Sequence, residues 1–139
     1  YFDQFVDPSP LRHAWTLSVE EQFYVIVPFL VLALVALLLV LAVPQAGAYY
    51  QASTVAQAAA NAAYSASRLM EGSAAEGRQA AQQVLAQHEG SLRGAEVSIS
   101  ASGDRMTVTV SGTAPTFTGE WLSPPVTRSI TGPVEKVVR

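Results

Sequence analysis

The sequence predicts an α+β protein with a single transmembrane helix near its N-terminus. Three observations support this fold class. No charged residue occurs from Phe23 to Val43, an apolar run of about 20 residues that matches a hydrocarbon core of about 30 Å. An Ala- and Gln-rich segment follows this run. Beyond it, apolar and polar residues alternate with the period of β-strands.

Composition excludes several classes of function. The 139 residues include no cysteine, so disulfides, thiolate chemistry and cysteine metal sites are excluded. A net charge of −3 with no cluster of Lys or Arg argues against nucleic-acid binding. The sequence begins with Tyr1, which is compatible with a fragment or a processed product.

We predict an extended lead-in over residues 1–17 and the transmembrane helix over residues 18–44. Ser18 and Glu21 form a capping-box pattern at its start. Prolines inside and at the end of the run predict kinks without breaks. Cleavage of a signal peptide at the following AVPQAGA is a less favoured alternative, because acidic residues precede the run and the run is long for a signal peptide.

Residues 45–72 predict a helical stalk, since alanine has the highest helix propensity. Small residues recur three and four positions apart along it and predict a smooth helix-packing face. This face consists of Ala56, Ala59, Ala60 and Ala63. Either a helix of another subunit packs there, or the stalk packs on its own domain.

Residues 73–139 predict a small α+β domain. Ser73 and Glu76 form a second capping box, so a helix is expected at about 74–89, closed near Gly90. Its inward residues are expected to be Ala80, Val84 and Leu85.

Two alternating strands and a short Gly-bearing loop between them predict a β-hairpin. Its buried residues are expected to be Val97, Ile99, Met106, Val108 and Val110. A third strand is expected near 125–131. In the connection before it, Trp121 is interpreted as a cover for the core.

Chemistry-bearing residues are sparse. His13 and His88 have no partner at metal-ligand spacing, and no nucleophile or phosphate-loop motif occurs, so we predict no cofactor, no metal and no catalytic residue. The polar cluster at the mouth of the membrane helix is the exception, because ionisable groups there are costly and often functional. It comprises Arg12, His13, Glu20, Glu21 and Gln22.

The segment PLRHAWTLSVEEQFYVIVPFLV, within about residues 8–31, resembles a signature of the multi-pass membrane O-acyltransferases that acetylate polysaccharides. The matching positions are His13, Trp15, Ser18, Glu20, Gln22, Phe23 and Tyr24. Thr16 stands where that signature has serine. The resemblance implies an inactive fragment, because the catalytic histidine of that family lies in an earlier helix.

From about residue 32 to residue 139, the chain instead resembles the TadE-like proteins, pilin-like single-pass components of tight-adherence (Flp) pilus machinery. VPQAGAYYQASTVAQAAANAAYSASRL, GSAAEGRQAAQQVLAQ and PVTRSITGPVEKV carry this resemblance. TadE-like proteins also carry Ser-Val-Glu before a proline-containing helix, as at Ser18–Glu20. No glycine or basic leader precedes Ser18, which departs from the prepilin pattern.

The leading prediction is therefore a non-enzymatic component of a pilus or secretion apparatus in the bacterial cell membrane. The resemblance to TadE-like proteins implies that its C-terminal domain, residues 73–139, lies outside the cytoplasm. Its partners are expected to be the membrane and other pilin-like or assembly subunits, bound through the transmembrane helix and stalk. The alternatives are an inactive acyltransferase fragment and a generic membrane-anchored adaptor. A chimera of the two families, joined near residues 28–34, is a further hypothesis.

Overall fold

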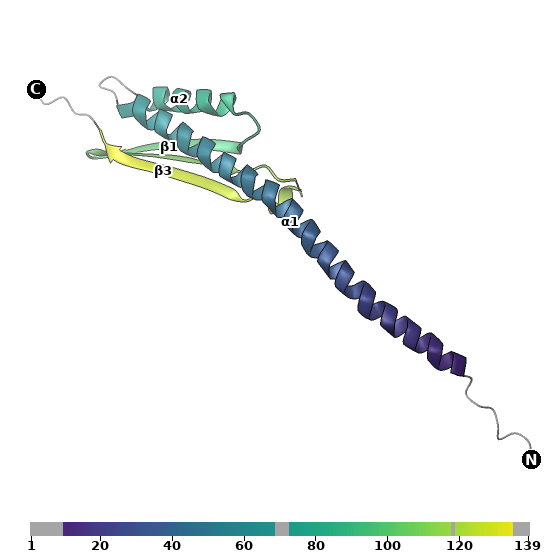
Figure 1. The fold of residues 1–139 in the computed structure, drawn as a ribbon. Coiled ribbons are helices and arrows are strands. Elements are labelled where there is room, and N and C mark those ends of the chain that lie inside the picture. Colours follow the sequence, from purple (N-terminus) through teal and green to yellow (C-terminus); the bar gives the residue numbers. More distant parts are fainter. Residues whose placement is uncertain (1–9, 69–72, 118, 135–139) are drawn as a thin grey trace, which may run out of the picture. The chain divides into compact units, whose positions relative to one another are not determined.

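The computed structural model describes residues 10–68, 73–117 and 119–134, with the side chains of residues 10–15 and 121 outside that description. Its elements, in order, are α1 (Pro10–Arg68), α2 (Ala74–Gln87), β1 (Arg93–Ser102), β2 (Arg105–Thr113), the 3-10 helix η1 (Glu120–Leu122) and β3 (Pro125–Pro133), as Figure 1 shows. The predicted α+β class is confirmed. The chain divides into two compact units, residues 1–42 and 43–139.

The first unit contains the apolar part of α1. Large apolar side chains are exposed all along this part of the helix; Phe29 and Leu32, for example, are each 69% exposed. The most apolar stretch of this helix has a mean hydropathy of 3.3, and none of it is buried by the rest of the chain. Length and composition therefore fit the predicted membrane-spanning helix.

The start of α1 differs from the prediction. The helix begins at Pro10, so residues 10–17 are helical and not an extended lead-in, while residues 1–9 lie outside the described part. Proline suits the first helical position because its φ is already fixed and no N–H is left unsatisfied. Ser18 and Glu21 consequently lie inside the helix, and the predicted capping box at its start is wrong.

The segment predicted as a stalk is part of the folded domain. The helix α1 continues without a break through Pro28 and Pro44 to Arg68. From Val43 onward it belongs to the same compact unit as α2 and the sheet. Residues 45–68 are therefore one of the two helices of the domain, and the last predicted stalk residues, 69–72, lie outside the described part.

The sheet is antiparallel and has the order β1-β2-β3. A two-residue loop, Gly103–Asp104, joins β1 to β2, and Ser102 pairs with Arg105 across it. Gly103 has a φ of +62°, which glycine adopts readily at the first position of a tight hairpin turn. The strand β3, which extends the predicted third strand, pairs with β2 from Pro125 opposite Thr113 to Pro133 opposite Arg105.

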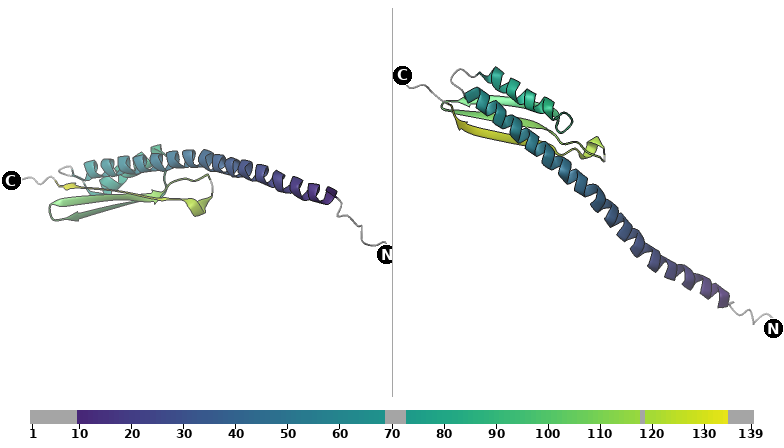
Figure 2. Two further views of the ribbon diagram at one scale, coloured as in Figure 1. Left: turned by 60° about the horizontal axis from the view of Figure 1, so that its bottom comes forward. Right: turned by 45° about the horizontal axis from the view of Figure 1, so that its top comes forward.

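The two faces of the sheet differ in chemistry because side chains alternate across each strand. Val108 and Val110 of β2 and Val126 of β3 are at most 2% exposed and form the core. Figure 2 shows α1 and α2 on this same face. The other face carries hydroxyl side chains, with Thr107 Oγ1 2.9 Å from Thr131 Oγ1. The predicted inward residues of β1, Val97 and Ile99, are partly buried against the core.

The predicted helix-packing face of α1 lies inside this core. Ala56, Ala59, Ala60 and Ala63 are each 0% exposed and form one cluster with Val108, Val110 and Ala81. The chain's own helix and sheet cover this face. Of the two alternatives left open by the sequence, packing on the chain's own domain is the one that the structure shows, and docking of a second subunit on this face is wrong.

The two helices approach each other closely at Gly77 of α2. A Cβ at this position would meet Ile99 Cδ1 at 2.8 Å, the Ala63 carbonyl oxygen at 2.9 Å and the hydroxyl of Ser67. A side chain here would force the helices apart. The capping box predicted for α2 is confirmed, because Glu76 N–H donates to Ser73 Oγ at 3.2 Å and Ser73 N–H donates to Glu76 Oε2 at 3.0 Å.

Two glycine substitutions test this packing. Gly77→Ala is expected to lower the free energy of unfolding by about 2 kcal/mol, because the added methyl group overpacks the contact between the helices. Gly47→Ala is the matched control, since nothing lies within 4 Å of its added Cβ, and it is expected to gain about 0.5–1 kcal/mol from helix propensity. Thermal unfolding in detergent micelles, followed by circular dichroism, measures both; equal shifts would contradict the close approach.

Candidate functional site

The acyltransferase-like signature occupies the first turns of α1. His13 and Trp15 lie in the helix, but their side chains are outside the described part. The remaining signature residues are all exposed: Ser18, Glu20, Gln22, Phe23 and Tyr24.

Helix geometry divides these residues between two faces. Residues four apart share a face, so Ser18 lies above Gln22 and Glu20 lies above Tyr24. At 100° per residue the two pairs point about 160° apart. A single helix therefore does not bring the signature together into one site.

A shallow depression also lies on this part of α1. Its lining residues are Ser18, Glu21, Gln22, Val25 and Ile26. All five come from successive turns of one helix, and no second element encloses the space. Nothing there excludes water or converges on a reacting group, which an active site requires.

The second unit contains a groove that two elements line, α1 and β3, and we call it the Arg128 groove. It has a volume of about 400 Å³ and is lined by Tyr50, Ser53, Thr54, Gln57, Ala58, Asn61 and Arg128. Six of these residues form a stripe along α1 at helical spacing. The seventh, Arg128, comes from β3 and is the one charged residue of the lining.

Arg128 occupies an unusual position in its strand. It lies opposite Val110, on the face of the sheet that otherwise carries the apolar core. Its guanidinium donates from Nε to Ser53 Oγ at 2.9 Å, and a second nitrogen donates to the same oxygen. Ser53 is only 7% exposed and so holds the guanidinium at the floor of the groove. Among the described residues, no carboxylate contacts Arg128.

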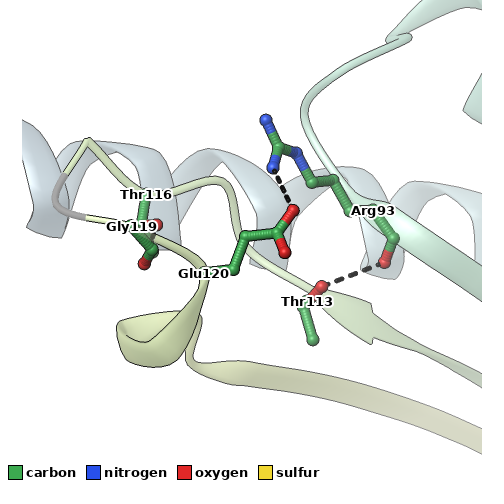
Figure 3. Close-up of polar contacts among 5 residues, drawn as sticks. All are labelled: Arg93, Thr113, Thr116, Gly119 and Glu120. Atoms are coloured by element: carbon green, nitrogen blue, oxygen red, sulfur yellow. Dashed lines mark hydrogen bonds and ion pairs between the residues drawn. The ribbon is translucent and has the colours of Figure 1, made fainter.

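A second polar cluster ties the connection between β2 and β3 to the start of β1 (Figure 3). Arg93 Nη1 lies 3.8 Å from Glu120 Oε1, and both side chains are largely exposed. Thr113 donates to the Arg93 carbonyl at 3.3 Å, and Thr116 donates to the Gly119 carbonyl at 2.7 Å. Exposed ion pairs of this kind contribute little to stability. We interpret these contacts as holding the connection between β2 and β3 in place, and not as a binding site.

Metal-binding and acid-base groups do not gather in the described part of the chain. No group of three or more His, Cys, Asp or Glu residues there is placed to hold a metal ion. His88, predicted as a surface residue near the end of a helix, is exposed, and its Nδ1 lies 3.0 Å from the Val84 carbonyl oxygen. The η1 backbone contains Trp121, but its predicted role as a core cover falls outside the described side chains.

The Arg128 groove was not predicted from the sequence. A signal for it was present, because Arg128 interrupts the apolar alternation of Val126 and Ile130 with a charge. The pattern did not indicate where the guanidinium would go. Only the fold shows that Ser53, 75 residues earlier, lies beside it.

Comparison with known proteins finds relatives for a short segment only. The chain is 57% identical over 35 residues to YrhL of Bacillus subtilis and 61% identical over 28 residues to OatA of Listeria monocytogenes, both named as peptidoglycan O-acetyltransferases. These matches cover 24% and 20% of this chain and only 6% and 4% of those proteins. An acyltransferase-like segment is thus supported. No protein-family model and no solved structure matches the chain, so the resemblance to TadE-like proteins has no support from these comparisons.

Ser53→Ala tests the anchoring of Arg128. Loss of the buried hydroxyl is expected to lower the free energy of unfolding by about 1 kcal/mol, because the guanidinium loses the hydroxyl that accepts two of its hydrogen bonds. Thr54→Ala is the matched control; the exposed Thr54 hydroxyl bonds only the Tyr50 carbonyl of its own helix. Alanine there is expected to be neutral or slightly stabilising. Thermal unfolding of the two variants should differ by several degrees, and equal curves would contradict the anchoring role.

Proposed function

We propose that this chain is a non-enzymatic, single-pass membrane protein that takes part in assembling a pilus or a related secretion apparatus in the bacterial envelope. The observation that carries the proposal is the continuity of α1. The same helix supplies an uncovered apolar stretch of membrane-spanning length and one of the two helices of a folded domain. Such a chain presents a domain at a membrane surface.

The absence of charge along the apolar stretch of α1 supports association within the membrane. No Asp, Glu, Lys or Arg occurs from Gln22 to Val43, so no charged group opposes burial of this stretch among other helices. The chain's own sheet covers the alanine face. The surface that remains for association with other membrane helices is therefore the exposed segment from Leu17 to Val43. In the proposal, this segment packs among the transmembrane helices of pilin-like subunits, and the C-terminal domain lies outside the cytoplasm.

The second candidate function is that of a fragment of a peptidoglycan O-acetyltransferase. The high identity of the short segment shared with the two named proteins favours it. Two features weigh against catalysis by the chain alone. The signature residues diverge around one helix, and the depression beside them has no enclosing wall. In this second reading, Glu20 and His13 act only together with further membrane helices.

Site-specific photo-cross-linking tests the first proposal. A photoreactive amino acid in place of Leu34 or Leu38, which are 57% and 58% exposed, is expected to capture other membrane subunits of the assembly in native cells. The same residue at Thr109, on the hydroxyl face of the sheet, serves as a control outside the apolar segment. Capture of lipid alone from both helix positions would contradict association through the transmembrane helix.

A cell-wall assay separates the two candidates. Under the first proposal, Glu20→Gln is expected to leave the ester-linked acetate of the cell wall unchanged, because no reaction depends on that carboxylate. Acetate released by mild alkali from purified peptidoglycan gives the measurement. A several-fold loss of acetate, with the protein still present in the membrane, would favour the acyltransferase role. Glu21→Gln is the matched control, since Glu21 is adjacent but is not one of the signature matches.

A further inference from the structure

In the described part of the chain no strand pairs with the outer edge of β3, which runs beside the Arg128 groove, and the backbone groups that point outward there can be identified. Val134 N–H donates to the Asp104 carbonyl at 3.0 Å, and Ala114 N–H donates to the Pro124 carbonyl at 3.1 Å. Hydrogen-bonded pairs alternate along an antiparallel ladder. With the observed register, the even-numbered residues of β3 bond to β2. The N–H and C=O groups of Thr127, Ser129 and Thr131 therefore point away from the sheet.

Two prolines agree with this assignment. Pro125 and Pro133 are the first and last residues of β3 and belong to the same outward-pointing set. Proline is tolerated in a sheet where its missing N–H would face away from the ladder. The two prolines lie at the ends of the edge. Between them, three outward-pointing residues can donate a backbone N–H: Thr127, Ser129 and Thr131. An added strand that pairs with this edge is therefore short.

Arg128 is suitably placed to recognise a side chain of such a strand. Because its own N–H and C=O point toward β2, it occupies a non-hydrogen-bonded position with respect to a strand added on the other side. Side chains approach most closely at such positions, with Cα atoms about 4.5 Å apart. A carboxylate at the facing position, on the helix-covered face of the sheet, is within reach of the guanidinium. The neutral side-chain amides of Gln57 and Asn61 line the space around it.

We propose that the edge of β3 and the Arg128 groove together bind a short extended peptide segment of another protein, which pairs with Thr127–Thr131 and places an acidic side chain against Arg128. This interaction does not depend on the function proposed above. The charge of Arg128 selects the acidic residue, since no carboxylate of the described residues contacts it.

A second copy of this chain fits the site poorly. Two β3 edges paired about Arg128 would place like charges opposite each other, which is destabilising. The strand β1 offers only Ala95, Val97, Ile99 and Ala101 on the helix-covered face, and none of these carries a carboxylate. The described strands of the chain therefore do not supply the acidic partner, and we assign it to a different polypeptide.

The test uses the full chain in detergent micelles and a fluorescent peptide, Thr-Ser-Thr-Glu-Thr-Ser-Thr, titrated by fluorescence anisotropy. Saturable binding is expected. Replacing the central Glu of the peptide by Gln is expected to weaken binding about ten-fold, and so is Arg128→Gln in the protein. Combining the two changes is expected to weaken it no further than either alone, because both remove one ion pair. Arg93→Gln, an exposed arginine at the far edge of the sheet, is the charge-matched control and is expected to leave binding unchanged.

Strand pairing is tested separately from charge. Ser129→Pro removes an outward N–H and is expected to weaken binding at least ten-fold while the circular dichroism spectrum is retained. A peptide of the same sequence with N-methylated backbone amides is expected to bind equally poorly to the unaltered protein, which gives the same information should Ser129→Pro fail to fold. Each of the following results would overturn the proposal: no binding up to about 1 mM peptide, equal binding of the Gln peptide, or equal binding of the N-methylated peptide. Preferential binding of an oligogalacturonate that depends on Arg128 would also overturn it, in favour of an acidic glycan.

Discussion

The close packing of small residues between α1, α2 and the sheet is the contact on which the domain depends. Ala56, Ala59, Ala60 and Ala63 have no accessible surface, and Gly77 of α2 lies against the backbone of α1. Larger side chains at these positions would push the two helices apart on the face of the three-stranded sheet that both of them cover. The same contact fixes the position of α1 along the sheet, and so it also places Ser53 beside Arg128. Packing in the core thereby sets the geometry of the surface groove.

One helix thus meets two different environments. Its apolar stretch is exposed throughout, whereas its alanine-rich part buries one stripe and presents another, polar stripe beside β3. In water the first arrangement would be costly, because each large apolar side chain loses about 1.5–3 kcal/mol relative to burial. A lipid environment removes this cost. Membrane association is therefore a direct consequence of what the chain leaves uncovered.

The match of the acyltransferase-like segment to longer proteins is local and does not establish catalysis by this chain. High identity over 35 residues establishes similarity of that segment, yet these residues cover only 6% of the longer protein. Catalysis needs groups that converge, and on a lone helix Ser18 and Glu20 point to different sides. The Arg128 groove, in contrast, has no conspicuous sequence motif. Its residues come from two elements far apart in the chain and are brought together by the fold.

The sequence by itself determined the elements of this protein. The charge-free apolar run, the capping box at Ser73 and the strict alternation around Val108 each depend on neighbouring residues, and for that reason all three were predictable. The tertiary structure decided the rest. It decided that the alanine face turns inward, because the chain's own sheet and α2 cover it. It also decided that Arg128 meets Ser53, because a contact between residues 75 apart leaves no periodic trace in the sequence.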